Sequence, residues 1–124
     1  MFFTECVVPV DLAFLIDASG SLKDSFQDIQ KFVKKVINAY KIGPDATHVA
    51  AISYSDDARV AFDFNTLKGK DLTKENLNKL VDKINATGGK TRIDLALRKA
   101  ATDIYSEKGG QRPGRPKVRS ILVS

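Results

Sequence analysis

The 124-residue chain has few of the residues that redox and transition-metal sites need. It contains one cysteine, Cys6, and one histidine, His48. A single cysteine excludes an intrachain disulfide and a cysteine-based zinc site, and a single histidine excludes a histidine-rich metal centre. His48 begins an expected strand, so we expect a structural role for it. The sequence also offers no base beside a serine nucleophile, so we do not expect an enzyme.

Long hydrophobic runs are also absent. No stretch approaches the ~18–20 apolar residues of a membrane span. Residues 1–6 lack the basic and apolar regions of a signal peptide. Apolar residues make up 43% and charged residues 28% of the chain, which is ordinary for a globular domain. With this length we expect one domain, residues 1–124.

Acidic residues are absent after Glu107. The five bases beyond it are Lys108, Arg112, Arg115, Lys117 and Arg119. Residues 1–107 are electrically neutral, so the net charge of +5 belongs to one segment. A nucleic-acid-binding domain would spread its charge differently, and we do not expect nucleic acid as a partner. One interpretation of the five bases is a polyanion-binding site, and the other is a solvated loop without aromatic residues.

Hydrophobic periodicity predicts strands that alternate with helices. The expected strands are residues 11–16, 48–54, 59–64 and 118–123, and the expected helices are 26–40, 73–84 and 92–105. The strand at 59–64 alternates apolar and polar residues, which is typical of an antiparallel edge strand. The whole pattern indicates an α/β fold with a doubly wound, Rossmann-like and mostly parallel sheet. Such sheets bind ligands beyond the carboxyl ends of their strands, where the loops 17–21 and 85–91 should meet.

The first of these loops carries oxygen side chains on alternate residues, Asp17, Ser19 and Ser21. Carboxylate and hydroxyl oxygens suit a hard cation such as Mg²⁺, which tolerates several waters and an exchangeable position. The small residues between them, Ala18 and Gly20, allow a tight turn around an ion. By spacing alone, a strand-end turn with a helix cap explains the same residues equally well.

The second loop contains the Gly-Lys-Thr sequence of residues 89–91. A phosphate-binding loop would also need glycine where Ile84 stands, so that match fails. Thr91 as a plain helix cap remains one interpretation. Residues 85–87 form a glycosylation sequon, so Asn85 is a candidate for modification in a secreted protein, and chance is the other explanation.

Taken together, the two loops resemble the von Willebrand factor type A domain, and its adhesion and extracellular-matrix members look closest. The likeness rests on Asp11-Leu-Ala-Phe-Leu-Ile-Asp-Ala-Ser-Gly-Ser21 and Thr87-Gly-Gly-Lys-Thr-Arg-Ile-Asp-Leu-Ala-Leu97, and it is supported by residues 49–55 and 118–123. It covers nearly the whole chain. The resemblance implies a secreted, extracellular protein that binds other proteins.

The resemblance further implies a metal-ion-dependent adhesion site for Mg²⁺, Mn²⁺ or Ca²⁺. By that likeness, Ser19 and Ser21 ligate the ion directly, and Thr91 does so directly or through water. Asp17 holds the site, often through water. An Asp or Glu carboxylate of an extracellular protein partner completes the coordination. A carboxylate on a half-open cation is an electrostatic anchor, which implies cation-dependent protein binding.

The sequence departs from the family pattern at its end. The family's next loop carries a further acidic metal residue, and the chain stops at Ser124, where that loop would begin. About two further strand–helix units are also absent, each of ~30 residues or more, so we expect a sheet that is incomplete on its C-terminal side. The exposed sheet edge predicts a homodimer or a partner-covered surface. Cys6 lacks the cysteine with which family members pair it, which leaves a free thiol or a bridge between two chains.

Three functions are compatible with these observations. The leading hypothesis is a cation-dependent protein-binding module. The second is a metal-independent interaction or structural protein, because the missing acid weakens the ion's site. The third is polyanion binding through residues 108–119.

Overall fold

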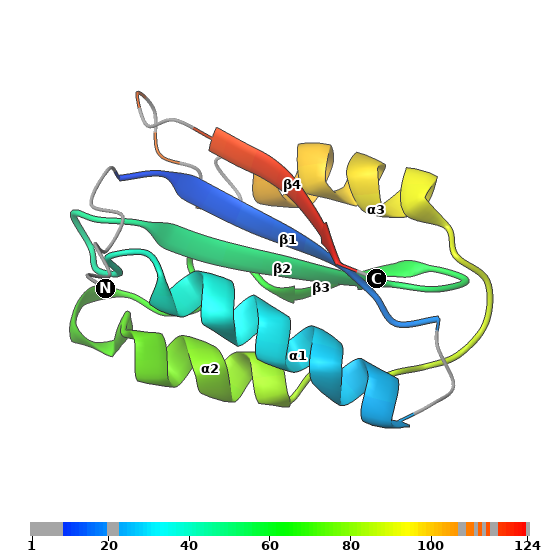
Figure 1. Cartoon of the computed structure of the whole chain (residues 1–124). Helices are drawn as coiled ribbons and strands as arrows, with labels where there is room; N and C mark the ends of the chain where they lie inside the picture. The colour runs from blue at the N-terminus through cyan, green and yellow to red at the C-terminus, as the bar shows by residue number, and fades with distance from the viewer. Residues whose placement is uncertain are drawn as a thin grey trace.

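The computed structural model describes residues 9–19, 23–106, 109–110, 112, 114 and 117–123, with the backbone alone for residues 23–24 and 117–123. The main elements in chain order are β1 (Asp11–Asp17), α1 (Lys23–Asn38), β2 (His48–Tyr54), β3 (Ala58–Phe62), α2 (Lys74–Asp82), α3 (Ile93–Lys99) and β4 (Lys117–Val123) (Figure 1). A 3₁₀ turn, η1 (Gly69–Asp71), precedes α2, and a π-helical turn, η2 (Ala100–Ile104), continues α3.

The four strands form one sheet in the order β3-β2-β1-β4. β1 runs parallel to both β2 and β4, whereas β2 and β3 form an antiparallel hairpin. The expected doubly wound, mostly parallel sheet with one antiparallel edge strand is confirmed. Because β2 and β4 lie on opposite sides of β1, the strand order reverses at β1. That reversal places the ligand-binding crevice of such sheets at the carboxyl end of β1.

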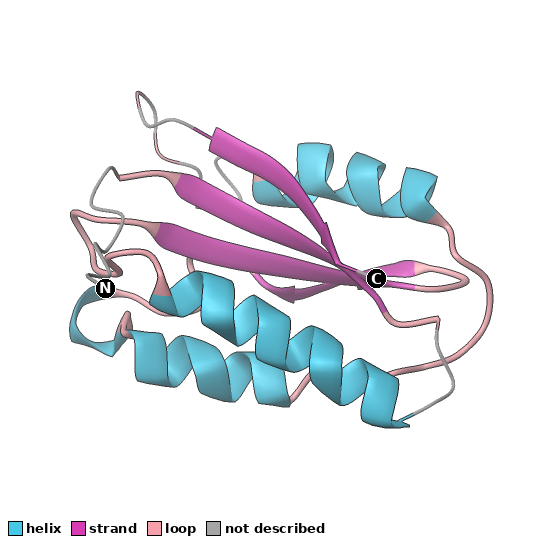
Figure 2. Cartoon of the chain, viewed as in Figure 1, coloured by secondary structure: helices cyan, strands magenta, loops and turns pink. Residues whose placement is uncertain are grey.

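The helices cover both faces of this sheet, with α1 and α2 on one face and α3 on the other (Figure 2). β1 therefore has to be apolar on both faces, which explains its continuous hydrophobic run. Its residues Leu12, Phe14 and Ile16 pack toward α1 and α2, whereas Ala13 and Leu15 pack toward α3. All five are at most 1% exposed. Burial of each large side chain stabilises the fold by roughly 1.5–3 kcal/mol.

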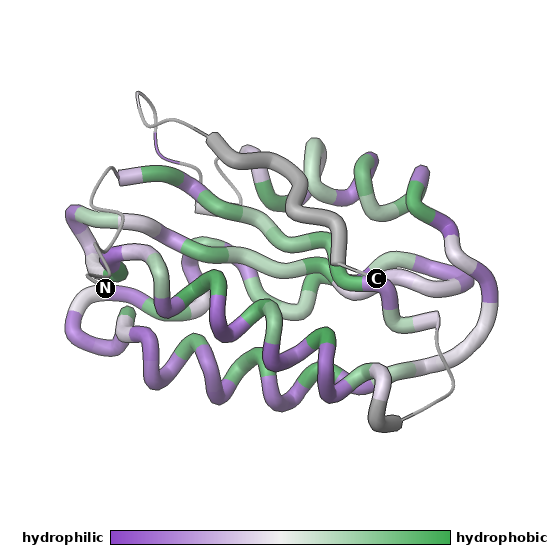
Figure 3. Tube along the Cα trace, in the orientation of Figure 1, coloured by the Kyte–Doolittle hydropathy of each residue, from purple (hydrophilic) through white to green (hydrophobic). Residues whose placement is uncertain are grey.

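The helices α1 and α2 are amphipathic, and hydrophobic residues recur along both at helical spacing (Figure 3). Val33 and Ile37 of α1 and Leu77 and Val81 of α2 are buried against the sheet. A side-chain contact also joins the two helices, because Gln30 Nε2 donates hydrogen bonds to the backbone carbonyls of Val81 at 3.2 Å and Ile84 at 2.9 Å. These two hydrogen bonds fix the C-terminal end of α2, and with it the start of the loop 85–91.

The expected helix at 92–105 is confirmed in extent but changes type. After α3 the backbone widens into η2, where the Tyr105 N–H donates to the Ala100 carbonyl at 2.8 Å. The wider turn lets the Tyr105 hydroxyl donate to the backbone carbonyl of Asp11 at 3.1 Å, and its ring stacks at a tilt on Phe64. The end of this helix is thereby joined to the start of β1.

Candidate metal centre

The candidate site begins at the carboxyl end of β1, of which Asp17 is the last residue. The backbone turns there, because the Ser19 N–H donates to Asp17 Oδ1 at 2.9 Å and the Ser19 hydroxyl donates to the same oxygen. The N–H of Ala18, between them, still donates to the Tyr54 carbonyl of β2 at 2.8 Å. The turn therefore presents a carboxylate and a hydroxyl together while its middle residue remains tied to the sheet.

The second loop meets this turn. The carbonyl of Ala18 accepts hydrogen bonds from the N–H groups of Thr87 at 2.9 Å and Gly88 at 3.0 Å. Thr91 Oγ1 lies 3.0 Å from Ser19 Oγ. The expected meeting of the two loops is confirmed by these contacts. Asp17, Ser19 and Thr91 share one place, and Ser21 lies outside the described residues.

The helix-cap interpretation of Thr91 is wrong. The residue at the N-cap of α3 is Arg92, which has no side-chain capping hydrogen bond. The Thr91 hydroxyl is turned instead toward Ser19, on a segment 72 residues away in the sequence. The Thr91 hydroxyl does not cap α3 and lies beside the Asp17 carboxylate and the Ser19 hydroxyl. It is therefore available as an oxygen ligand.

Residues after β2 hold the second loop, and sequence reasoning missed them. Ser55 Oγ lies 2.8 Å from Thr87 Oγ1, and the Ser55 carbonyl accepts from the Arg92 N–H at 3.0 Å. Asp56 Oδ1 accepts from the Lys90 N–H at 2.8 Å. Asp56 lies between the expected strands 48–54 and 59–64, and the sequence pattern assigned it no functional role. The signal was present, because β2 ends at the same sheet edge as its parallel neighbour β1.

Gly89 is required at the contact between this loop and Asp56. Its φ is +100°, in the left-handed region that side chains rarely adopt. A Cβ at this position would lie 2.6 Å from Asp56 Oδ2. The glycine therefore allows the loop to approach the carboxylate and sets where Thr91 emerges.

The Tyr54 phenol lies in the electrostatic surroundings of Asp17. Burial raises the pKa of the Tyr54 phenol, and the negative charge of Asp17 raises it further. Asp17 and Ser19 are half-buried and Thr91 is exposed. The described residues contain no group of three or more His, Cys, Asp or Glu side chains that could hold a metal. One carboxylate with hydroxyls is instead an all-oxygen donor set, which fits a hard cation that retains water ligands.

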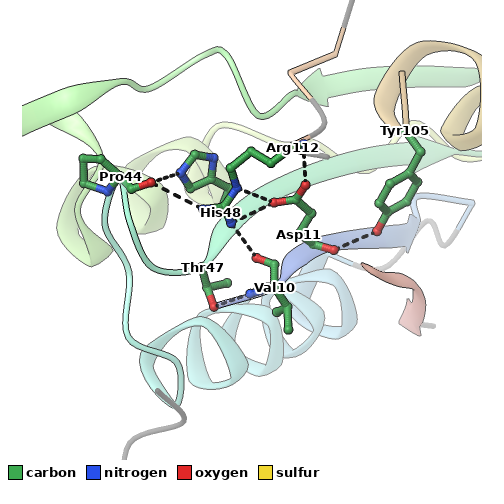
Figure 4. A network of polar contacts seen from close by, with 7 residues as sticks. All are labelled: Val10, Asp11, Pro44, Thr47, His48, Tyr105 and Arg112. Carbon is green, nitrogen blue, oxygen red and sulfur yellow. Dashed lines mark hydrogen bonds and ion pairs between the residues drawn. The ribbon is translucent and has the colours of Figure 1, made fainter. Parts of the chain in front are cut away.

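The basic segment divides into parts that the structure describes differently. Lys108 and Arg115 lie outside the described residues, and only the backbone of Lys117 and Arg119 is described. Arg112 is bound to the protein itself (Figure 4). Its backbone N–H donates to Asp11 Oδ2 at 2.8 Å, and its guanidinium pairs with Asp11 Oδ1 at 2.8 Å.

This ion pair lies at the amino end of β1. The Asp11 side chain is 0% exposed and that of Arg112 is 17% exposed. The guanidinium also donates to the carbonyls of Val10 at 3.2 Å and Pro44 at 3.4 Å. His48 lies in the same network, with Nε2 3.0 Å from the Pro44 carbonyl (Figure 4). Arg112 therefore has internal partners, which removes it as a ready ligand for a polyanion, and His48 lies at the sheet end opposite the loops, as expected.

Two further expectations concern the surface. Asn85 is exposed in the loop after α2, where its side chain is accessible to modification. Its glycosylation stays a prediction. Cys6 lies outside the described residues. No helix in the described part of the chain has the length and apolarity of a membrane span.

The fold and this site define an A domain, and the chain belongs to the von Willebrand factor type A domain family, whose model matches residues 11–124. It is 37% identical over 118 residues to the collagen alpha-1(XX) chain of Homo sapiens, with 94% of this chain and 9% of that protein covered. It is 27% identical over 116 residues to matrilin-3 of Gallus gallus, with 93% and 25% covered.

A solved structure is similar in both fold and sequence. It is that of proximal thread matrix protein 1 from the mussel byssus with a zinc-occupied MIDAS motif, with a TM-score of 0.79 and 27% identity. The match covers 95% of this chain and 29% of that one. The curated relatives are secreted matrix proteins, and they confirm the extracellular-matrix type and the extracellular location expected from the sequence. The chain spans a quarter or less of the length of these two relatives.

Proposed function

We propose that this chain is a divalent-cation-dependent protein-binding module of the extracellular matrix. One observation carries the proposal: the hydroxyls of Ser19 and Thr91 lie 3.0 Å apart beside the Asp17 carboxylate, to which Ser19 is hydrogen-bonded. Three oxygen donors from two distant segments meet at the ligand-binding end of the sheet. A strand-end turn by itself would not require the third donor.

Asp17, Ser19 and Thr91, with Ser21 as a further ligand, would hold Mg²⁺, or Mn²⁺ or Ca²⁺ in its place. These are hard cations that favour oxygen ligands. The mussel protein has zinc in its MIDAS motif, which supports a divalent cation without selecting one. When bound, the ion supplies a positive charge that attracts the carboxylate of an Asp or Glu on an extracellular protein partner.

The chain's own residues prepare this site. Asp17 orients the Ser19 hydroxyl and supplies the negative charge that a cation needs. The hydrogen bonds of Thr87 and Gly88 to Ala18 hold the Thr91 loop against the turn. Because the loop is fixed before the ion arrives, less ordering accompanies binding. Thr91 is exposed, so a cation held by these residues would be accessible to the carboxylate of a partner.

The test is a titration of the folded chain with Mg²⁺ and Mn²⁺, alongside the Ser19→Ala variant. We expect the parent chain to bind the ion saturably. In Ser19→Ala the affinity for the ion should be about 10- to 100-fold lower, since even changes in the groups around the ligands have effects of that order. Ser106→Ala, which alters a serine beyond the other end of α3, is the matched control and should bind the ion normally.

A folded parent chain that shows no response at millimolar Mg²⁺ or Mn²⁺ would refute this function. It would leave the metal-independent interaction protein as the better hypothesis. Retention on heparin that falls with salt would favour the polyanion binder instead.

A homodimer through a sheet edge is a second proposal. Within the described strands, β4 pairs with β1 and is the last strand of the sheet on that side. An unpaired edge is a template for another strand. Sedimentation of the chain at high concentration tests it, and a well-folded monomer would contradict it.

A further inference from the structure

A hollow of about 240 Å³ lies beside the candidate metal centre, between β3 and the end of α2. Its floor is apolar and is formed by Leu80 and Ile84, which pack on the α1 and α2 side of the sheet. Its polar lining includes Arg59 and Lys83. No carboxylate lines this hollow among the residues that the structure describes.

The two cations come from different parts of the sequence. Arg59 pairs with Ser53 in the β2–β3 register, so both lie on the same face of the sheet. Lys83 is the residue that ends α2. Both are exposed, and neither has an ion pair with any described residue.

Two other basic residues, Lys34 and Arg92, do have ion-pair partners. Lys34 pairs at 2.8 Å with Asp82, the residue directly before Lys83. Arg92 pairs with Asp94 at 2.8 Å. Among the described residues, the positive charges of Arg59 and Lys83 therefore have no ion-pair partner, whereas those of Lys34 and Arg92 have one. Two such cations over an apolar floor favour a ligand with both an anionic group and an aliphatic part.

Thr87 connects the hollow to the metal centre. It lines the hollow, and its N–H donates to the Ala18 carbonyl between Asp17 and Ser19. Its hydroxyl contacts Ser55, which also receives the Arg92 N–H. A ligand held at the metal centre by one group therefore has the hollow within reach of its next residues.

We propose that this hollow is a second anchor for an acidic peptide segment of the partner, with Arg59 and Lys83 receiving a carboxylate other than the one at the cation. The assignment to a metal-bound partner rests on the proposed function. A glutamate fits the lining because its methylene groups cover Leu80 and Ile84 while its carboxylate reaches the two bases. A sulfated glycan has the charge but little apolar surface for this floor.

Synthetic peptides test the proposal with the full chain. The probes are a peptide with two glutamates separated by one to four glycines, the same peptide with one glutamate, and a heparin disaccharide. Each is titrated in Mg²⁺ and in EDTA by NMR, with amide shifts as the readout. The test variant carries Arg59→Glu and Lys83→Glu. The matched control carries Lys31→Glu and Lys35→Glu, which change the net charge equally on exposed residues of α1.

We expect the amide signals of residues 59–61 and 83–87 to shift with the two-glutamate peptide, also in EDTA. In Mg²⁺ the test variant should bind that peptide at least about tenfold more weakly, which is about 1.4 kcal/mol. The control variant should resemble the parent chain. In Mg²⁺, the one-glutamate peptide occupies the metal centre, so its affinity should be the same in all three proteins, as should the affinity for Mg²⁺ itself.

Equal affinity of parent and test variant for the two-glutamate peptide would overturn the proposal. So would a loss of equal size in the control variant, because general charge would then explain the effect. Stronger shifts in the hollow with the heparin disaccharide than with peptide would assign it to a glycan instead. Failure of the metal centre is distinguishable, since it removes the Mg²⁺ response and leaves the EDTA shifts at residues 59–61 and 83–87.

Discussion

The strand β1 carries an aspartate at each end, and the two are treated in opposite ways. Asp11 is wholly buried and receives the backbone N–H and the guanidinium of Arg112. Asp17 is half-buried, accepts its hydrogen bonds from neutral groups of Ser19, and has no basic partner in the described part of the chain. An aspartate thus forms a buried ion pair at the amino end of β1 and stays partly exposed at its carboxyl end. These ends are called the closed end and the open end below.

The difference is physical and concerns how each charge is compensated. A buried charge has lost its water, so it needs a permanent partner from the protein, and removal of that partner is costly. A partly exposed carboxylate keeps part of its hydration, so it does not need a partner within the protein and can bind an external cation. The amino end of β1 therefore contributes to stability, and the carboxyl end is available for binding.

The largest expected effect is at the closed end. Arg112→Ala would leave the Asp11 carboxylate buried and unpaired, so we expect the free energy of unfolding to fall by about 3–5 kcal/mol. Urea unfolding measures it. Arg98→Ala, which removes an exposed arginine of α3, should cost less than about 0.5 kcal/mol. A loss below about 1 kcal/mol in Arg112→Ala would show that the two aspartates are not differently held.

A smaller effect is expected at the open end. Gly89→Ala introduces a Cβ at 2.6 Å from Asp56 Oδ2 in addition to its unfavourable φ of +100°. Gly88→Ala has only the unfavourable φ of +70°, with nothing within 4 Å of its Cβ. We expect a cost of about 1–2 kcal/mol for Gly88→Ala and more for Gly89→Ala, which should also weaken Mg²⁺ binding by displacing Thr91. Equal Mg²⁺ affinities in the two variants would argue against this role of the loop.

The Tyr105 hydroxyl gives a third comparison. Tyr105→Phe removes the donor to the buried Asp11 carbonyl, so we expect a loss of about 1 kcal/mol in unfolding free energy and no change in Mg²⁺ affinity. Tyr40→Phe is the control, because Tyr40 is only half-buried. A change in Mg²⁺ affinity in Tyr105→Phe would mean that the two ends of β1 are coupled.

The smallest effect concerns pH. The hydrogen bonds from the Arg92 guanidinium lower the pKa of Asp94 from 3.8 to about 2. Since the folded-state pKa is lowered, the stabilisation by this pair is present above the ordinary pKa and is lost as the pH falls from about 4 toward 2. Both side chains are about half exposed, so the change in stability should be slight. An NMR titration of the Asp94 carboxyl in the parent chain and in Arg92→Ala measures it, with a return toward 3.8 expected in the variant.

Much of the fold was predictable because its signals are local. The apolar run of β1, the helical spacing in α1 and α2, and the alternation in β3 each follow from which faces are buried. Helix ends were less predictable: α1 begins at Lys23, three residues before the expected start, and α3 changes into η2. Local pattern does not show where a tertiary contact such as that of Tyr105 widens the last turn.

The candidate site divides in the same way. Asp17 and Ser19 were candidates because their oxygen side chains follow a strand signal in the sequence, whereas Thr91 was a candidate through the resemblance to the von Willebrand factor type A domain. The supports of that site, Ser55 and Asp56, were not. The Ser55 hydroxyl contacts Thr87, and the Asp56 carboxylate accepts from the Lys90 N–H. Each partner lies more than 30 residues away, and local sequence pattern does not connect segments that far apart.

By itself, the sequence determined the strand and helix order, the oxygen chemistry of the two loops and the confinement of the excess charge to residues after Glu107. Only the tertiary structure decided how those pieces are used. It made Arg112 the partner of Asp11 and Gly89 a spacer against Asp56, and it placed Arg59 and Lys83 beside one hollow without an ion pair to any described residue. The reason is that the pairing and burial of a charge depend on which distant segments the sheet brings together, and charge along the chain does not record that.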